Sequence, residues 1–370
     1  LDLKANCVKK VYFSDTDNRP DMAKTPVPLW ELINVKHYAS MSIQYSRGCP
    51  YDCEFCDIII MNGRVPRTKT VSQFLNELDA IYVTGFRGSV FVVDDNFIGN
   101  KNKVKKMLLE VIEWQEKKGH PFDFTTEASL NLADDENLMQ MMVRAGFNKV
   151  FIGIETPIKA SLVECNKIQN EKRDMVASIK KIQNYGLHPL GGFIIGFDND
   201  PPSIFDDQIN FIQKAGVVVA MIGLLQSLPK TRLHYRLETE GRLLEKSSGN
   251  NTDGSLNFIP KMDAEILARG YKKVIQTIYS SKKYYERMLV FLGEYNPPKK
   301  KKGKLQMYEV GAFLKSIWYL GLRGGWESRW YYWKAIFVTF FKYPKSFSEV
   351  VVMLIHGLHF HKVAEKIAKS

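Results

Sequence analysis

Three of the chain's five cysteines gather in one short segment, SRGCPYDCEFCD, whereas Cys7 and Cys165 stand alone. The three are Cys49, Cys53 and Cys56, and their spacing is C-x3-C-x2-C. Thiolates are soft ligands, and several of them together suit a metal centre. Five cysteines in 370 residues are too few and too clustered for a secreted disulfide framework, so these thiols are available as ligands.

This spacing leaves three interpretations open. Positions i, i+4 and i+7 share one helix face and could bury three thiols, but Gly48, Pro50 and the charged neighbours argue against a buried helix. A structural zinc site prefers four closed ligands, commonly two pairs, and the sequence offers no second pair of this kind. An iron–sulfur cluster held by three thiolates leaves one iron open to bind another molecule, and it fits best.

Such a site needs a scaffold, and the pattern between residues 41 and 228 supplies one. Short β-branched apolar runs alternate there with segments of helical period, as in βα units that build a parallel sheet. We expect strands near 41–46, 89–94, 122–127, 149–155, 190–197 and 218–225. We expect helices over 70–85, 100–119, 134–146 and 202–216, each ending in a glycine suited to a C-cap. Six units predict an α/β fold, a partial (β/α)6 TIM-like barrel with the cysteine segment at its C-terminal mouth.

The rest of the chain divides into three further parts. Residues 1–40 are predicted to be a polar linker from a missing N-terminal domain, because the chain opens on Leu1 and is punctuated by Pro and Asp. Residues 229–298 are predicted to be a helical extension of the barrel, which occupies residues 41–228. Residues 299–370 are predicted to be a basic, aromatic-rich helical tail, so an α-helical C-terminal domain follows the barrel.

Polar residues recur where the later strands are expected to end, as a site at the barrel mouth requires. They are Asp94, Asp95 and Asn96 after the second strand, Glu127, Ser129 and Asn131 after the third, Glu155 and Thr156 after the fourth, and Gly191, Gly192 and Gly196 along the fifth. Lys167, Gln169, Asn170 and Arg173 also follow the fourth strand. On successive strands, the carboxylates look like a ring that faces one ligand.

Structural explanations of these residues stay open. The Asp94–Asn96 segment could cap the next helix, and each acid could lie in a surface loop. The glycines could reflect packing alone, and the segment NKIQNEKR could be a solvated helix start.

The cysteine motif, with Phe55 immediately before its third cysteine and a βα repeat around it, resembles the radical S-adenosylmethionine (SAM) enzymes. In that family the open iron of a 4Fe-4S cluster chelates the amino and carboxylate groups of SAM. The reduced cluster then cleaves SAM to methionine and a deoxyadenosyl radical, which abstracts hydrogen from the substrate. The resemblance implies that Cys49, Cys53 and Cys56 ligate the cluster. It also implies that SAM is positioned by Phe55, Asp94, Asp95, Asn96, Glu127, Ser129, Asn131, Glu155, Thr156, Gly192 and Gly196, with the glycines beside adenine.

Further segments, among them PLWELI, VDDNFIGNK, TEASLNLA, FIGIETP and GGFIIGFDND, look like the cobalamin-dependent class of this family, in the subgroup with the hopanoid ring-A methylases. In that class a cobalamin domain with a D-x-H-x-x-G loop precedes the barrel. None of the seven histidines here has an Asp two residues before it. Cobalamin is therefore expected only if a missing N-terminal domain exists.

The basic charge lies mostly in the tail, where residues 299–370 hold 14 lysines and arginines against 4 acids, out of a net charge of +12 for the whole chain. The same tail holds Trp318, Trp326, Trp330 and Trp333. Three interpretations are open: aromatics packed on the barrel, docking on an anionic membrane surface, or RNA binding. Among nucleic-acid and membrane partners, the sequence favours peripheral membrane contact.

These observations predict an enzyme that functionalises, and in this class methylates, an unactivated carbon of a small molecule such as a polycyclic lipid. An electron donor such as flavodoxin or ferredoxin would reduce the cluster. Without a signal peptide or a long apolar run, the chain is expected in the cytoplasm, with peripheral contact at the inner membrane face. The alternatives are an RNA-modifying radical SAM enzyme and a non-catalytic iron–sulfur or zinc-binding interaction protein.

Overall fold

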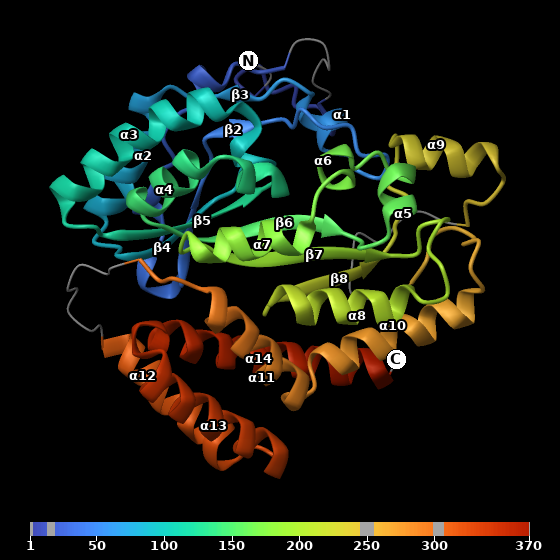
Figure 1. Cartoon of the computed structure of the whole chain (residues 1–370). Helices are drawn as coiled ribbons and strands as arrows, with labels where there is room; N and C mark the ends of the chain where they lie inside the picture. The colour runs from blue at the N-terminus through green and yellow to red at the C-terminus, as the bar shows by residue number, and fades with distance from the viewer. Residues whose placement is uncertain (1–2, 13–18, 245–254, 299–306, 370) are drawn as a thin grey trace.

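The computed structural model describes residues 3–12, 19–244, 255–298 and 307–369. Its main sheet has six parallel strands in the order β1-β4-β5-β6-β7-β8 (Figure 1). The strands are β1 (Ser40–Ile43), β4 (Gly88–Val92), β5 (Phe122–Ala128), β6 (Phe147–Glu155), β7 (His188–Ile195) and β8 (Ala220–Leu224). Each of the six lies where the apolar runs predicted a strand, so the partial (β/α)6 barrel is confirmed.

Helices connect the strands and cover the outer face of the sheet (Figure 1). They are α2 (Val71–Val83), α3 (Lys101–Lys118), α4 (Glu136–Ala145), α5 (Lys159–Glu164), α6 (Ile168–Glu171), α7 (Met175–Asn184) and α8 (Ile204–Ala215). Gly119, Gly146 and Gly216 close α3, α4 and α8 in the left-handed conformation, which glycine adopts without a steric penalty. The four helices expected in this region are present.

The first strand is shorter than the sequence indicated, because the segment after Ile43 turns into a small antiparallel hairpin. This hairpin pairs β2 (Ser46–Arg47) with β3 (Arg67–Thr68), and the segment between them holds the cysteines and α1 (Ile58–Asn62). Short 3-10 turns lie before β1 and after β4 and β5: Met22–Lys24, Trp30–Leu32, Val35–His37, Phe97–Asn100 and Leu130–Asp134.

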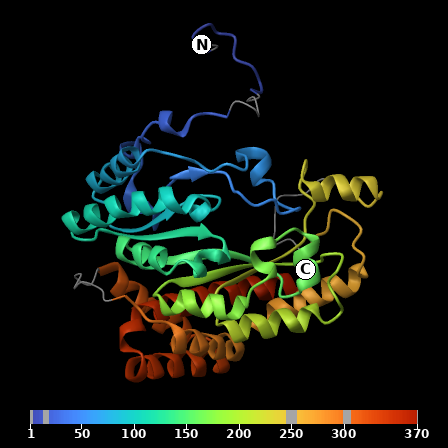
Figure 2. The ribbon, with the colours of Figure 1, turned by 45° about the horizontal axis from the view of Figure 1, so that its top comes forward.

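The C-terminal region is helical, as predicted. It contains α9 (Arg232–Thr239), α10 (Ala264–Ile278), α11 (Ser281–Glu294), α12 (Met307–Ser316), a π-helical turn η6 (Ile317–Leu322), α13 (Trp326–Lys342), the turn Pro344–Ser346 and α14 (Phe347–Lys369). One hydrophobic core runs from Met41 through Phe291 to Ile367, so α10, α11 and α14 pack directly on the barrel (Figure 2).

Parts of the predicted linker, extension and tail lie outside the described residues: 1–2 and 13–18, 245–254, and 299–306 with 370. The lysine-rich run at 299–304 is among them. Within the described ranges, no helix combines the length and the apolar character that crossing a bilayer requires.

Candidate functional site

The three clustered cysteines lie in one irregular loop between β2 and α1, and none forms a disulfide. Cys53 is buried, whereas Cys49 and Cys56 are half-buried. Gly48 opens the loop with φ +106°, and an added Cβ there would lie 2.8 Å from the carbonyl oxygen of Gly63. Only glycine therefore suits this position, where two backbone segments meet at the start of the cysteine loop.

Asp94 and Asp95, directly after β4, hold the start of this loop through its backbone. Both carboxylate oxygens of Asp94 accept backbone N–H groups, from Tyr45 at 2.7 Å and Ser46 at 2.8 Å. Asp95 Oδ2 accepts the backbone N–H of Gly48 at 2.8 Å. Asp94 is only 1% exposed and its oxygens accept hydrogen bonds from the loop, so the structure shows a positioning role, and a contact of Asp94 with a ligand stays a prediction.

The alternative that this segment caps the next helix is wrong. The side chain that accepts from the first turn of α3 is that of Asn100, not of Asp94 or Asp95. Asn96 precedes the Phe97–Asn100 turn without making a side-chain cap.

A chain of polar side chains joins the ends of β4 and β5 to the first cysteine. Asn96 Nδ2 lies 3.6 Å from Cys49 Sγ and 3.2 Å from Ser129 Oγ. The Ser129 hydroxyl donates to Asn131 Oδ1 at 2.6 Å, and Asn131 Nδ2 donates to the hydroxyl of Tyr51 at 2.8 Å. The structure thus brings three of the predicted residues together beside Cys49, because parallel strands end at one edge of the sheet.

Glu127 lies near the end of β5, where the charges of Asp94 and Asp95 act on it. Burial, and then the nearby charges of Asp95 and Asp94, raise the pKa of Glu127 to about 7. Near neutral pH a substantial fraction of this carboxyl is therefore protonated and able to donate a hydrogen bond.

A buried ion pair lies at the end of β6. Lys167 Nζ is 2.6 Å from Glu155 Oε1, and both side chains are at most one-tenth exposed. An added Cβ at Gly153 would lie 2.5 Å from Glu155 Oε1 and 3.0 Å from Lys167 Nζ, so the glycine makes room for the pair. Glu155 itself has φ +67°, a strained conformation for a residue other than glycine. Neither partner is a surface residue, and the idea that the Lys167 segment is a solvated helix start is wrong for Lys167 and for the buried Asn170.

Polar atoms around this pair remain unused within the described residues. Gln169 Nε2 lies 4.0 Å from Cys53 Sγ, whereas its Oε1 is buried without a hydrogen-bond partner. Asn170 Oδ1 and Gln208 Oε1 are likewise buried and unpaired, although the amide groups of both residues donate to the end of β6. Unpaired buried acceptors are costly, so their presence around the end of β6 fits a site that a polar ligand completes.

The remaining predicted residues have structural roles that the sequence did not resolve. The ring of Phe55 packs 6.1 Å from that of Phe197 and joins a small apolar cluster under α9. Thr156 is fully buried, and its hydroxyl accepts the backbone N–H of Ile158. Gly192 lies under the ring of Phe151, and Gly196 turns the chain with φ +110°. Packing and turn geometry therefore account for the two glycines, and a contact with adenine remains a prediction.

Arg236 on α9 clamps three loops around the cysteines. Its guanidinium holds Glu54, between the second and third cysteines, through two hydrogen bonds of 2.8 and 3.1 Å. It also reaches Asp198 at 2.7 Å and Glu164 at 3.5 Å, which follow β7 and end α5. Although burial works in the opposite direction, Arg242 and Arg236 lower the pKa of Asp198 to about 2.

The backbone completes this contact between the cysteine loop and α9. The N–H of Leu233 donates to the carbonyl oxygen of Glu54 at 3.0 Å, and Arg232 donates to the carbonyl oxygen of Asp52 at 2.6 Å. The sequence analysis missed this clamp, because a lone arginine 182 residues away from Glu54 carries no local signal.

We expect Arg236→Gln to weaken retention of a metal cluster by about tenfold, because residues that orient a ligand loop typically tune metal affinity to that extent. The measurement is the rate at which a reconstituted protein loses iron to a chelator. Arg236→Lys keeps the positive charge but not the bidentate hydrogen bond to Glu54. It should therefore lose iron more slowly than Arg236→Gln but faster than the wild type. Arg269→Gln, which removes an exposed pair with Glu265, is the control. Iron loss at equal rates in Arg236→Gln and in the control would show that the clamp does not hold the cluster loop.

The donor set of the loop consists of three thiols, the donor type that iron–sulfur clusters take. Within the residues that the structure describes, no three His, Cys, Asp or Glu side chains converge as ligands of one metal ion. Burial raises the pKa of Cys53, and that of Cys56 to about 12, so cluster binding must displace their protons.

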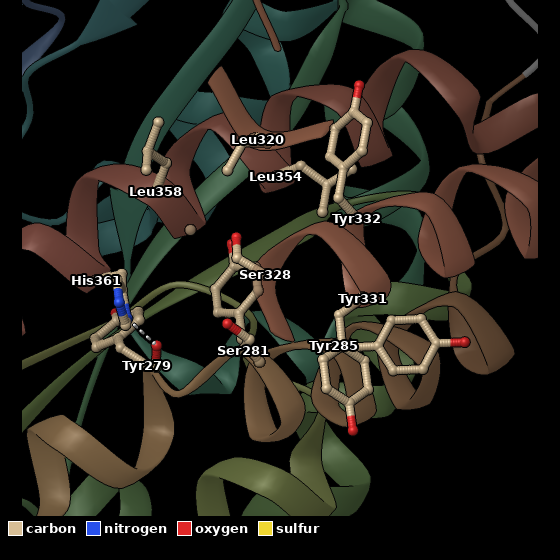
Figure 3. Close-up of a pocket in the computed structure, with 12 residues that line it drawn as sticks. Tyr279, Ser281, Tyr285, Leu320, Ser328, Tyr331, Tyr332, Leu354, Leu358 and His361 are labelled. Carbon is tan, nitrogen blue, oxygen red and sulfur yellow. Dashed lines mark hydrogen bonds between the residues drawn. The ribbon is translucent and has the colours of Figure 1, made fainter. Parts of the chain in front are cut away.

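A separate cavity of about 60 Å³ lies in the C-terminal helices (Figure 3). It is lined by residues of α11, α13 and α14, with Tyr285, Tyr331 and Tyr332 among its aromatic rings. None of the predicted site residues lines it.

Comparison with known families matches two parts of the chain. The model of the radical SAM superfamily matches residues 43–212, which cover the cysteine loop and most of the barrel. The model of a domain of unknown function matches residues 231–370, from α9 to the end of the chain.

Two curated proteins resemble most of the chain. An uncharacterised methyltransferase of Synechocystis sp. is 41% identical over 95% of this chain and 66% of its own length. The hopanoid C-2 methylase of Rhodopseudomonas palustris is 35% identical over 88% of this chain and 62% of its own length. The chain thus spans somewhat less than two thirds of these relatives.

A solved structure shows the same fold. The cobalamin-dependent SAM radical enzyme OxsB, with aqua-cobalamin and SAM bound, aligns over 100% of this chain and 62% of its own length, with a TM-score of 0.55 and 14% sequence identity.

Proposed function

This chain belongs to the radical SAM superfamily, and we propose that it is an enzyme that methylates an unactivated carbon. The observation that carries the proposal is the C-x3-C-x2-C loop at the mouth of a six-stranded parallel half-barrel, where the ends of β4, β5 and β6 bring polar residues to it. Relatives named as methyltransferases support the reaction class. The family implies a 4Fe-4S cluster and SAM.

We assign the cluster to Cys49, Cys53 and Cys56. When bound and reduced, the cluster supplies the electron that splits SAM into methionine and a deoxyadenosyl radical. Asn96 and Gln169 direct amide N–H groups toward the sulfurs of Cys49 and Cys53. Hydrogen bonds of this kind tune the potential of such clusters.

We assign the binding of SAM to the polar groups that surround the loop. Glu127, Glu155, Ser129 and Asn131 offer acceptors for the ammonium and hydroxyl groups of SAM, and Lys167 offers a cation for its carboxylate. Gln169, Asn170 and Gln208 add buried acceptors that have no partner among the described residues. Asp94, Asp95 and Phe55 position the cysteine loop in this assignment.

The relatives also direct the choice of substrate and partners. A polycyclic lipid is the proposed substrate class, because a hopanoid methylase is 35% identical to this chain. An electron donor such as flavodoxin or ferredoxin would reduce the cluster. Cobalamin belongs to the proposal only for a longer protein that carries a cobalamin-binding domain. A lipid substrate makes contact of the C-terminal helices with a membrane part of the same proposal.

The proposal is tested by anaerobic reconstitution of the chain with iron and sulfide. We expect about four irons per chain and formation of 5′-deoxyadenosine from SAM when dithionite is present. Zinc in place of iron, or an iron-loaded protein that leaves SAM intact, would support a non-catalytic metal-binding protein instead. Modification of added tRNA with no methylation of a lipid would support the RNA-modifying alternative.

A further inference from the structure

Helix α13 has two unlike faces. One face packs inward, where Tyr332, Ala335, Ile336 and Thr339 are buried. Tyr332 and Ile336 form an apolar cluster with residues of α14, and Tyr332 also lines the cavity drawn in Figure 3. The orientation of α13 on the molecule is therefore fixed by its own core contacts.

The opposite face of α13 is aromatic and open to solvent. Its residues recur at helical spacing and fall within about 100° around the helix axis. They are Trp326 (77% exposed), Trp330 (57%), Phe337 (57%), Phe340 (62%) and Phe341 (78%). Figure 1 shows α13 as the outermost helix, on the side of the molecule opposite β2 and β3.

The stretch before α13 also carries exposed large side chains. Leu314, Trp318, Tyr319 and Leu322, on α12 and η6, are each at least half exposed. We call the nine exposed residues of 314–341 the aromatic face. Soluble monomers rarely expose so many large apolar side chains together, and such a gathering marks a contact surface.

The segment that carries the aromatic face is rich in cations and almost free of acids. Between residues 314 and 345 the sequence has Lys315, Arg323, Arg329, Lys334, Lys342 and Lys345, and the one acid is Glu327. Two of the cations lie against exposed rings: Arg323 is 5.7 Å from the Trp318 ring centroid, and Arg329 is 5.9 Å from that of Trp326. The face therefore suits a partner that is both apolar and negatively charged.

We infer that the aromatic face docks α13 flat on a bilayer that contains anionic phospholipid. A helix with aromatics on one side and flanking lysines and arginines is the form that lies in the headgroup region. A second copy of this chain fits poorly, because a symmetric contact would set the same six cations against each other. RNA fits poorly as well, because a convex helix offers no basic groove along a strand.

This inference rests on the proposed function, because a lipid substrate gives the protein a reason to dock on a membrane. It adds the surface that would contact the lipid. Vesicle binding itself needs neither cluster nor SAM. Failure of the docking surface can therefore be told apart from failure of the radical chemistry, because SAM cleavage is assayed on the same proteins without lipid.

The test is co-sedimentation of the full chain with vesicles of phosphatidylcholine, with or without 30 mol% phosphatidylglycerol. We expect binding to the anionic vesicles, weakened by about three- to tenfold when salt screens the charges. The triple variant Trp326→Ser, Trp330→Ser and Phe341→Ser should lose at least about tenfold in partitioning. The matched control, Leu32→Ser, Val83→Ser and Leu109→Ser, removes equally exposed apolar residues elsewhere and should bind like the wild type.

Several outcomes would overturn the inference. The inference fails if the wild type binds neither kind of vesicle, or if the two triple variants bind vesicles equally well. It also fails if the wild type forms a dimer that the aromatic-face variant does not form, or binds tRNA that this variant does not bind. Circular dichroism and the thermal midpoint check that both triple variants fold, which is expected because every changed residue is exposed.

Discussion

Replacing Cys53 with alanine is expected to abolish cluster binding and SAM cleavage together. Two thiolates cannot hold a cluster that three hold with one iron left open, so the iron content after reconstitution should fall from about four per chain to a small residue. Formation of 5′-deoxyadenosine should fall to the level without protein. Iron and sulfide content, with chromatography of the SAM products, measures both.

Cys165→Ala is the matched control for this substitution. Cys165 is also buried, and its backbone oxygen accepts the N–H of Glu54, but its side chain contacts Leu162 rather than the proposed ligand set. It should keep near-normal iron and activity. Retention of about four irons by Cys53→Ala, or equal loss in both variants, would contradict the assignment of the ligands.

Lys167→Met is expected to destabilise the cluster-free protein by about 3–5 kcal/mol, because it leaves the buried carboxylate of Glu155 without its cation. Although burial opposes the charged form, the Glu155 carboxylate raises the pKa of Lys167, so the Lys167 side chain is charged at neutral pH. Urea unfolding of the apoprotein measures the effect without relying on activity.

Two comparisons make the measurement specific to this pair. Adding Glu155→Gln to Lys167→Met should recover part of the lost stability, since no unpaired charge then remains. Lys180→Met, which breaks a half-exposed pair with Glu294, should cost no more than about 1 kcal/mol. If Lys167→Met lowers the free energy of unfolding by no more than Lys180→Met does, the ion pair of Lys167 and Glu155 does not contribute the stability that its burial implies.

The sequence was sufficient for the barrel because its signals are local. Apolar runs marked the six strands, and Gly119, Gly146 and Gly216 marked helix ends that must be left-handed. The gathering of Asn96 and Ser129 was also predictable, because the carboxyl ends of parallel strands meet at one edge.

Hydrogen bonds and ion pairs between residues far apart in the chain could not be predicted from the sequence. The two oxygens of Asp94 are consumed by backbone N–H groups of a loop 48 and 49 residues earlier, and no pattern around Asp94 shows it. Arg236 reaches the cysteine loop from an equally unmarked position on α9. The sequence also could not show that one face of α13 is exposed. An aromatic residue suits a core and an interfacial surface alike, and only its exposed fraction in the structure separates the two.

The measurement that tests the central claim most directly is the electron paramagnetic resonance spectrum of the reconstituted, dithionite-reduced chain, recorded before and after addition of SAM. If three cysteines leave one iron open for SAM, the signal of the reduced cluster should change on addition of SAM and stay unchanged with adenosine. A cluster signal that saturating SAM leaves unaltered would contradict the account.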